Sequence, residues 1–443
     1  MQFKQYPSYK NSGVEWLGEV PEHWQIVRTK DIFNHRKEEA LEDDEIVTAF
    51  RDGQVTLRKN RRTDGFTNSI KEHGYQHINS GDLVIHEMDA FAGAIGVSDS
   101  SGKSTPVYSV CYAKNENINH HFYSHFFRTM AKTGFINSLA KGIRVRSTEF
   151  RWNESRNVYL VEPPKSDQQK IVAFLDTETT RIDNLISKQE KLIELLEEQR
   201  KSIISHAVTK GLNPNAPMKD SGVEWLGEVP KHWSYSSLKY VLKQKKGAIK
   251  SGPFGSHLKS SDMVYSDVKV INQRNVIDKD FIGGDNFISF EKYEELKSFT
   301  IYPKDVLVTT RGTIGKVAQV AEDLPISILH PCLIRIQVDE NKVLFDYINY
   351  FFECEKLSLE QLRYASNAAT IDVIYCENLA SIYLPIPSIS EQNEIIKYLK
   401  DEDIKINKLI SKQKTLIEKL KEYRSSIISH AVTGKIDVRE FVA

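Results

Sequence analysis

Residues 12–24 read SGVEWLGEVPEHW, and residues 221–233 read SGVEWLGEVPKHW. The two segments, here called the heads, differ at a single position. Two further elements, here called the tails, are also repeated: LISKQ at 185–189 and 409–413, and SIISHAVT at 202–209 and 426–433. The order is head, variable block, tail, and then the same again. This duplication predicts that one fold unit occurs twice in the chain.

The composition is typical of a globular protein. The chain has 443 residues, of which 40% are hydrophobic and 27% are charged, and this length is enough for two ordinary domains with additional helices. No apolar run approaches the length that spans a bilayer. The four cysteines are far apart and no His/Cys pair has zinc-ligand spacing, so we expect reduced thiols in a cytoplasmic protein without a metal or membrane site.

The charge is balanced overall but uneven along the chain. The formal net charge is zero, whereas residues 51–160 hold 15 Lys and Arg against 10 Asp and Glu. A local positive region of this kind suits a protein that binds DNA with one face. Clustered charges are equally typical of a solvated surface, and the charge pattern alone does not separate the two interpretations.

Each tail predicts a long helix. Segments 167–209 and 391–433 contain no Gly or Pro, and their apolar residues recur at helical spacing. If continuous, 43 residues would extend about 65 Å, although Asp and Thr within 176–180 allow a break. Heptads that start at Ile182 and Ile406 predict a helix–helix seam. Its residues are Ile182, Leu185, Gln189, Leu192, Leu196 and Ile203, with Ile406, Leu409, Gln413, Leu416, Leu420 and Ile427.

The connection between the repeats predicts how the two helices run. Residues 210–217 (KGLNPNAP) stop the first helix and lead directly into the second head. The first helix therefore runs from block one to block two, and the second should return. We expect an antiparallel pair with one block at each end, internal pseudo-two-fold symmetry, and Met1 near Ala443. The expected domains are 1–160, 161–217 (helix and linker), 218–388 and 389–443 (second helix).

Between head and tail, each block has short β-like runs separated by Gly and Asp turns. Block one contains 82–85, 93–97 and 107–112, and block two contains 268–271, 305–310 and 332–336. Helical stretches occur in both blocks, so the fold class is α+β with two mixed α/β domains. The blocks share this layout but little sequence. This is the arrangement expected of one framework that carries two different binding surfaces.

The heads, the tails, their duplication and the divergent blocks together resemble the specificity (S) subunit of type I restriction-modification systems. The most specific segments are Ser12–Trp24 with its copy, both tail motifs, and Gly434–Arg439. Residues 251–258 (SGPFGSHL) and 309–315 (TTRGTIG) resemble target recognition domains of that family, and residues 82–88 with 93–96 resemble a different class of the same domain.

The resemblance implies a division of labour among subunits. Each block would be a target recognition domain that reads one half of an asymmetric bipartite sequence in double-stranded DNA. The paired helices would set the half-site spacing and dock two methyltransferase subunits, which bind S-adenosylmethionine. Restriction subunits, with ATP and Mg, can join the complex. This chain itself would bind no cofactor and would not be an enzyme on its own.

Basic and polar residues in the two blocks are the candidates for DNA contact, because phosphates attract Lys, Arg and polar loops. In block one they are Arg58, Lys59, Arg61, Arg62, Lys141, Arg144, Arg146 and Arg151. In block two they are Lys245, Lys246, Lys250, Ser251, Ser256, Arg274 and Arg311. Each residue taken alone is equally compatible with a solvated surface charge. By contrast, the Trp residues repeated in both heads are expected to anchor each head against its block and helix.

Catalytic motifs are incomplete. Gly102-Lys103-Ser104 lacks the glycine of a phosphate-binding loop, because residue 97 is Val97. Glu162-Pro163-Pro164-Lys165 lacks the flanks of an adenine methyltransferase motif. Two alternatives to the DNA-reading subunit remain: a coiled-coil scaffold whose end domains bind proteins, and an enzyme with an active site hidden in one block.

Overall fold

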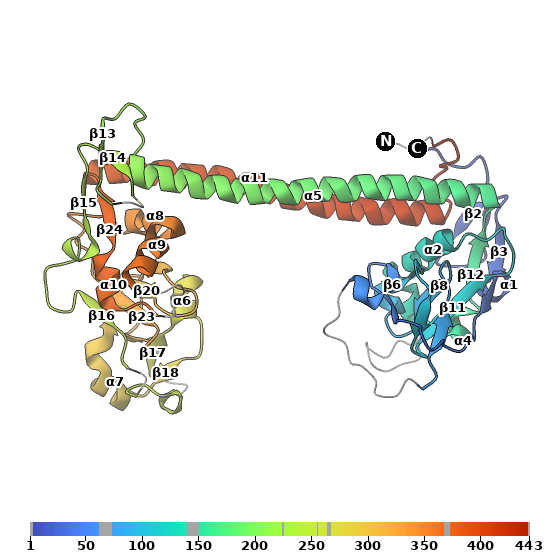
Figure 1. Cartoon of the computed structure of the whole chain (residues 1–443), viewed down its shortest axis with the longest axis horizontal. Coiled ribbons are helices and arrows are strands. Elements are labelled where there is room, and N and C mark those ends of the chain that lie inside the picture. Colours follow the sequence, from blue (N-terminus) through green and yellow to red (C-terminus); the bar gives the residue numbers. More distant parts are fainter. Residues whose placement is uncertain are drawn as a thin grey trace. The chain divides into compact units, whose positions relative to one another are not determined.

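The computed structural model describes residues 3–61, 73–139, 150–223, 226–254, 256–263, 267–366 and 373–441. They form two compact units. Unit 1 comprises Met1–Glu190 and Lys414–Ala443, and unit 2 comprises Lys191–Gln413. Each unit therefore joins one head and one variable block to part of both long helices (Figure 1).

Both heads form the same β-hairpin. In unit 1, β1 (Tyr9–Asn11) pairs with β2 (Glu19–Pro21), and in unit 2, β13 (Met218–Asp220) pairs with β14 (Glu228–Pro230). The next strand of each repeat pairs with the last strand of its block. These pairs are β3 (Gln25–Arg28) with β12 (Tyr159–Glu162), and β15 (Ser234–Ser237) with β24 (Tyr383–Ile386). The start and end of each block are therefore joined beside a long helix.

Block one contains an antiparallel sheet in the order β4 (Phe33–His35), β11 (Tyr108–Ala113), β8 (Leu83–His86), β9 (Ile95–Val97). Two hairpin-like pairs flank it: β5 (Val47–Ala49) with β6 (Val55–Leu57), and β7 (Gln76–Ile78) with β10 (Gly102–Ser104). Helix α2 (His120–Lys132) packs on the sheet through buried aromatic residues such as Phe122 and Phe126. The short helices are α1 (Thr29–Ile32), α3 (Phe135–Ser138) and α4 (Trp152–Ser155).

Block two repeats this sheet with different residues. Its order is β16 (Ile249–Ser251), β23 (Leu333–Ile336), β20 (Val306–Thr309), β21 (Val317–Gln319). A second sheet has the order β18 (Phe287–Ile288), β17 (Val268–Ile271), β22 (Ser327–Leu329), β19 (Thr300–Ile301), with β17 and β22 parallel. The helices are α6 (Gln273–Ile277), α7 (Phe290–Leu296), α8 (Phe345–Glu353), α9 (Glu355–Ser366) and α10 (Cys376–Ser381).

The two tails are the continuous helices α5 (Lys165–Lys210) and α11 (Ile389–Val432). The break considered at 176–180 is absent. In unit 1, Arg424 of α11 makes two hydrogen bonds, of 2.8 and 3.0 Å, with the carboxylate of Asp183 of α5. In unit 2, the equivalent Arg200 contacts Asn407, which occupies the position equivalent to Asp183. The same cross-helix contact is therefore made twice.

The seam is only partly the one predicted. Ile182, Leu196, Ile406 and Ile427 are buried, and Leu185, Gln189, Ile203, Gln413 and Leu420 are partly buried. Leu192, Leu409 and Leu416 were expected in the seam but are 39%, 43% and 41% exposed. Ile410 and Ile417 are buried instead. A helix with 3.6 residues per turn drifts away from a strict seven-residue repeat, so the contact stripe moves to the neighbouring positions.

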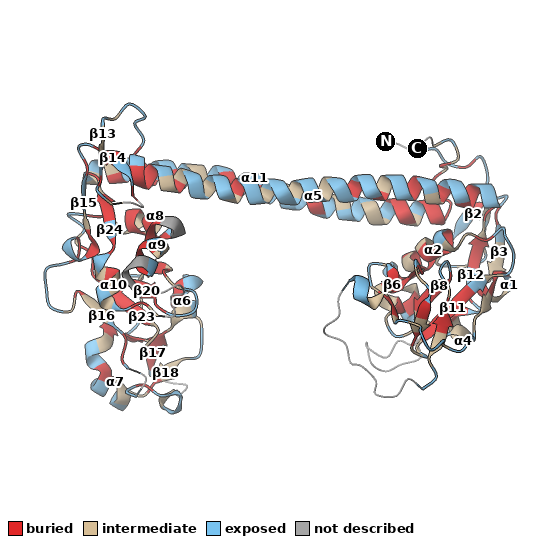
Figure 2. Ribbon diagram, viewed as in Figure 1, coloured by how far each residue is buried: buried red, intermediate tan, exposed pale blue. Residues whose placement is uncertain are grey.

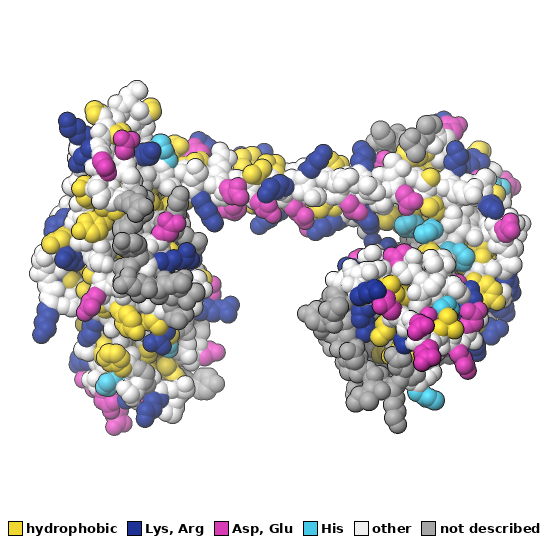
Figure 3. Space-filling model, viewed as in Figure 1, with side chains coloured by type: hydrophobic (Ala, Val, Ile, Leu, Met, Phe, Trp, Pro, Cys, Tyr) yellow, Lys and Arg dark blue, Asp and Glu magenta, His cyan; other side chains and the backbone are white. Residues whose placement is uncertain are grey.

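The unburied leucines contribute to apolar surface on the long helices. Figure 2 shows exposed and buried residues alternating along both helices, and Figure 3 shows hydrophobic side chains among the charged ones on their surface. Leu192 and Leu416 occupy equivalent positions in the two tails. None of the helices in the described residues is both long enough and apolar enough to cross a membrane.

Each head is fixed to the ends of both long helices by its buried tryptophan. In unit 1, Trp24 Nε1 lies 3.4 Å from Asp167 in the first turn of α5, and a Cβ at Gly434, just after α11, would lie 2.9 Å from the indole. In unit 2, Trp233 donates to Glu391 in the first turn of α11 at 2.8 Å, and Gly211 lies against its ring. The anchoring role expected for the tryptophans is confirmed at these two positions.

The same contacts establish the direction of the helices within each unit. The start of α5 and the end of α11 meet at the first head, and the start of α11 and the end of α5 meet at the second. The helices are therefore antiparallel in both units. Residues near the two chain ends lie together, since the backbone N–H of Asp437 donates to the Lys4 carbonyl at 2.8 Å. Met1 and Ala443, which were expected to be neighbours, lie outside the described residues.

A buried glutamine near the start of each long helix forms hydrogen bonds with its block. Gln168 accepts a hydrogen bond from the Asn119 N–H and donates to the carbonyls of Asn117 and Pro163. Gln392 makes the same three kinds of contact, with the Leu344 N–H and the carbonyls of Lys342 and Pro387. Both side chains are fully buried. The internal hydrogen bonding of the two units is thus conserved between blocks of different sequence.

Candidate nucleic-acid interface

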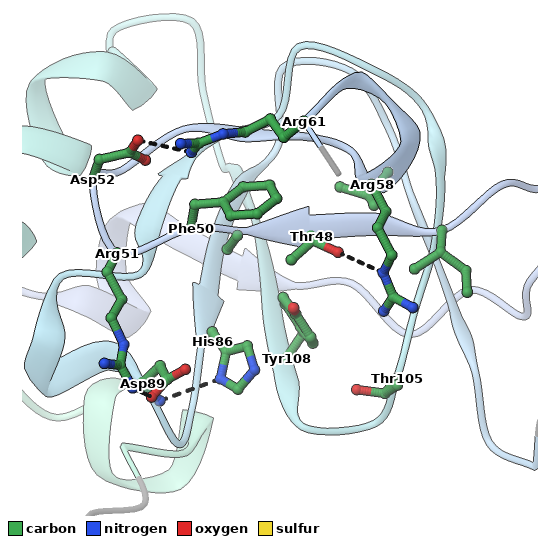
Figure 4. Close-up of a pocket in the computed structure, with 13 residues that line it drawn as sticks. Thr48, Phe50, Arg51, Asp52, Arg58, Arg61, His86, Asp89, Thr105 and Tyr108 are labelled. Carbon is green, nitrogen blue, oxygen red and sulfur yellow. Dashed lines mark hydrogen bonds and ion pairs between the residues drawn. The ribbon is translucent and has the colours of Figure 1, made fainter. Parts of the chain in front are cut away.

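A pocket of block one has a volume of about 810 Å³. It is formed by β5, the following turn, β8, β11 and the short 3₁₀ helix Arg58–Asn60 (Figure 4). Its lining combines three arginines with three aromatic or imidazole rings. They are Arg51, Arg58, Arg61, Phe50, His86 and Tyr108.

Hydrogen bonds hold the arginines around the pocket. Arg51 pairs with Asp89 at 2.9 Å, and Arg61 pairs with Asp52 at 2.7 Å. The Arg61 guanidinium also lies 4.2 Å from the centre of the Phe50 ring, a cation–π arrangement. These pairs orient the guanidinium groups but leave much of their surface open, since the side chain of Arg51 is 66% exposed.

The floor of the pocket is less polar. The rings of His86 and Tyr108 are 4.5 Å apart. Burial lowers the pKa of His86, and burial raises the pKa of Tyr108 to about 12. Both rings are therefore uncharged near neutral pH and present hydrogen-bonding edges and faces. A pocket with cations at its rim and neutral rings below suits a ligand that combines negative charge with planar groups, as a nucleic acid does.

The other candidates of block one are placed as follows. Arg58 donates to Thr48 Oγ1 at 3.3 Å within the same pocket. Lys59 pairs with Glu45 on the outer side of the 3₁₀ helix. Arg151 is exposed immediately before α4. Four candidates lie outside the described residues: Arg62, Lys141, Arg144 and Arg146.

In block two, two of the predicted arginines come from neighbouring elements. Arg274 lies on α6, its side chain is 89% exposed, and it pairs with Asp278 at 3.1 Å. Arg311 is exposed in the turn after β20. The two elements meet at Gly312, where a Cβ would lie 3.4 Å from the Gln273 side chain. In block one, by contrast, the pocket arginines come from the turn after β5 and the region of the 3₁₀ helix.

The remaining candidates of block two are exposed, except for the partly buried Lys250. Lys245 and Lys246 are exposed in the turn before β16, as are Ser251 on β16 and Ser256 in the loop that follows. The Lys250 ammonium, however, donates to the Ser298 carbonyl at 2.7 Å and lies 4.3 Å from the Phe299 ring centre. Its side chain is engaged within its own domain.

Sequence reasoning did not select Arg51, His86 or Tyr108. Arg51 lies in the turn Arg51–Gln54 between two short apolar strands, β5 and β6. The signal that could have identified Arg51 is its position in a tight turn between two β-like runs. His86 and Tyr108 lie on paired strands and could be brought together only by knowing the register of β8 and β11.

Comparisons with known proteins indicate the family and the fold of this chain. A sequence profile for the type I restriction modification DNA specificity domain matches residues 21–196 and 230–419. The type I restriction enzyme MjaVIII specificity subunit of Methanocaldococcus jannaschii is 24% identical over 441 residues, which cover 95% of this chain and 94% of the relative.

Two solved structures share the fold. The HsdS subunit from Thermoanaerobacter tengcongensis aligns with a TM-score of 0.53 and 16% identity over 94% of this chain and 98% of that one. A chain from a type I R-M system, solved to explain complex assembly and conformational transition, aligns with a TM-score of 0.64 and 15% identity over 93% and 98% of the two chains. With the duplicated profile match, these likenesses show that the chain belongs to the family of type I restriction-modification specificity subunits.

Proposed function

We propose that this chain reads DNA in two halves, one half with each block, and directs a methyltransferase to the site. The observation that carries the proposal is the contrast between framework and surface. The buried contacts of Gln168 and Gln392 are equivalent. By contrast, the pocket arginines of block one come from the turn after β5 and the 3₁₀ helix region, whereas Arg274 and Arg311 come from α6 and the turn after β20. Two different surfaces on one framework suit an asymmetric bipartite target.

The candidate surfaces have the chemistry for this task. Arginine can donate two hydrogen bonds to guanine in the major groove or pair with phosphates. Arg51, Arg61 and Arg274 are each held by a neighbouring carboxylate, which orients the guanidinium group before DNA arrives. The proposed role of the long helices is to fix the distance between the half-sites, because a continuous helix is a stiff spacer.

The long helices also have surface suited to protein partners. Leu192 and Leu416 occupy equivalent positions and are 39% and 41% exposed. Two equivalent apolar faces favour two copies of one partner, and methyltransferase subunits are the partners that the family membership suggests. S-adenosylmethionine would be bound by those subunits, and ATP and Mg by restriction subunits when present. This chain would act in the cytoplasm, without cofactor and without catalysis of its own.

The exposed leucines would also suit a protein scaffold, so the test must measure DNA directly. The isolated full chain is titrated with short duplexes at several salt concentrations. A DNA-reading subunit loses affinity steeply as salt rises, because bound cations release counterions from phosphates. The chain should neither methylate nor cleave DNA alone, and methylation at a bipartite site should appear when a methyltransferase subunit is added. Salt-independent or absent DNA binding would favour the scaffold.

A further inference from the structure

A second pocket in unit 1, of about 260 Å³, lies between α2 and the last turns of α11. Three residues of α2 contribute charge or potential charge to it: His125, Arg128 and Lys132. Helix α11 contributes hydroxyl groups from Ser425, Ser426 and Ser429. Thr129, Thr133 and Ile428 complete the wall, and the described lining residues include no carboxylate. It is therefore a largely apolar cavity with cations and hydroxyl groups at its border.

Neither Arg128 nor Lys132 forms an ion pair among the described residues, and the Asp52 carboxylate, which is paired with Arg61, only partly offsets the charge of Arg128. Arg424, on the same turn of α11 as the serines, is paired with Asp183. Arg128 Nε and His125 Nδ1 are buried and have no hydrogen-bond partner in the part of the chain that is described. The Lys132 ammonium, at the exposed rim, contacts only the hydroxyl of Ser425, at 3.3 Å.

The pKa shifts of these side chains favour a site that binds an anion. Burial lowers the pKa of Arg128, and the nearby Arg424 lowers it further. Burial, Arg128 and Arg424 together lower the pKa of Lys132. Unpaired buried cations are costly, and a bound anion would remove that cost. Buried polar atoms without partners are uncommon in native proteins and call for an explanation.

The pocket adjoins the recognition surface of block one. A Cβ at Gly53 would lie 2.4 Å from the Arg128 guanidinium carbon, so this guanidinium packs directly on the turn between β5 and β6. The same turn carries Arg51 and Asp52 of the large pocket. A duplex whose bases face that pocket would bring its backbone close to Arg128. Cations combined with serine hydroxyls are the usual protein contacts of DNA phosphates.

We propose that Arg128, Lys132 and the α11 serines form an anion pocket that holds one phosphate of the DNA backbone beside block one. The proposal rests on the DNA-binding function proposed above. It gives α11 a direct contact with DNA in addition to its role as a spacer. The site is not duplicated, because α2 and α8 begin after the equivalent N-cap residues Asn119 and Leu344, and the residue of α8 equivalent to Arg128 is then the exposed Glu353.

Lys132→Met tests the proposal in the isolated full chain. Salt-dependent binding to duplexes of two unrelated sequences is compared with that of Lys170→Met, a matched change of an exposed α5 lysine in the same unit. Loss of one phosphate contact should lower the slope of log K against log salt by about 1. The affinity loss should be the same for both sequences, and Lys170→Met should match wild type.

Ser425→Asp provides an independent test, because it places a carboxylate beside the Lys132 ammonium. The variant should gain thermal stability and lose DNA affinity, whereas a purely structural cluster would gain stability with unchanged DNA binding. If wild type binds DNA with a steep salt dependence and Lys132→Met behaves like Lys170→Met, the phosphate pocket is refuted while the proposed function stands. If Lys132→Met keeps DNA binding and loses a methyltransferase subunit, the pocket holds an acidic protein group instead. If wild type itself does not bind DNA, both proposals are wrong.

Discussion

Trp233 Nε1 donates a 2.8 Å hydrogen bond to Glu391 Oε1, so the second head is attached to the first turn of α11. Trp24 and Asp167 form the equivalent, longer contact at the start of α5. A carboxylate in the first turn also interacts favourably with the helix dipole. One pair of residues thus joins a head to the first turn of a long helix, which explains why the tryptophan occurs in both copies.

Removal of this acceptor should destabilise unit 2. Glu391→Ala leaves the buried indole N–H of Trp233 without a partner, and we expect a loss of about 1–3 kcal/mol in the free energy of unfolding. Urea denaturation measures the change. Glu391→Gln is the control, since its amide oxygen can still accept the bond and should recover most of the stability. Equal stability of wild type and the Ala variant would contradict the anchoring role.

Substitution of either buried glutamine should reduce stability more than substitution of a glutamine in the helix–helix seam. Gln168→Leu removes the partners of one N–H and two carbonyl groups, and we expect a loss of at least about 2 kcal/mol. Gln392→Leu should behave alike. The partly buried Gln189 is the matched control, and Gln189→Leu should be near neutral in the same denaturation experiment. A mild effect of Gln168→Leu would show that water replaces its hydrogen bonds.

The contact stripe of the long helices predicts different losses of stability when two leucines one turn apart are replaced. Leu196 is 8% exposed and packs with Ile406 and Ile410, so Leu196→Ala should cost about 2–4 kcal/mol. Leu192 is 39% exposed, and Leu192→Ala should cost less than about 1 kcal/mol. In a pull-down with a methyltransferase subunit, Leu192→Ala should nevertheless weaken binding. Equal losses of stability for the two variants would match the seam expected from the heptads.

His125 should make unit 1 sensitive to acid. Burial, with Arg128 nearby, lowers its pKa to about 3, below the ordinary value of about 6.5. The unfolded chain therefore binds a proton between these values that the folded chain does not, and stability falls as pH decreases through that window. Between pH 6 and 4, the free energy of unfolding of His125→Gln should fall less than that of wild type. The difference should be up to about 1.4 kcal/mol per pH unit. Parallel pH profiles would show that His125 does not contribute.

Much of the fold could be predicted because the chain repeats itself. The nearly identical heads and the repeated tail motifs required equivalent surroundings, and Trp24 and Trp233 are indeed held by equivalent contacts. The direction of the helices followed from the short linker. The seam was less predictable, because a heptad template treats Leu192 and Leu196 alike, whereas the true helical period exposes one and buries the other.

The sites were harder to predict for a different reason. Arg58 and Arg61 were selected from their clustering, but His86 and Tyr108 are brought to the same pocket by strand pairing that has no local signature. Likewise, Lys250 resembles a surface lysine in sequence, and only the fold brings it to the Ser298 carbonyl. Arg128 and Ser425 are about 300 positions apart, and no sequence pattern joins them.

The central claim is that the two blocks read separate halves of one target. It is tested most directly by replacing residues 234–385 with the corresponding block of another family member, assembling the chimera with the methyltransferase subunit, and mapping the methylated adenines. Our account predicts that one half of the recognised sequence changes and that the other half and the spacing remain. A change in both halves, or in neither, would contradict it.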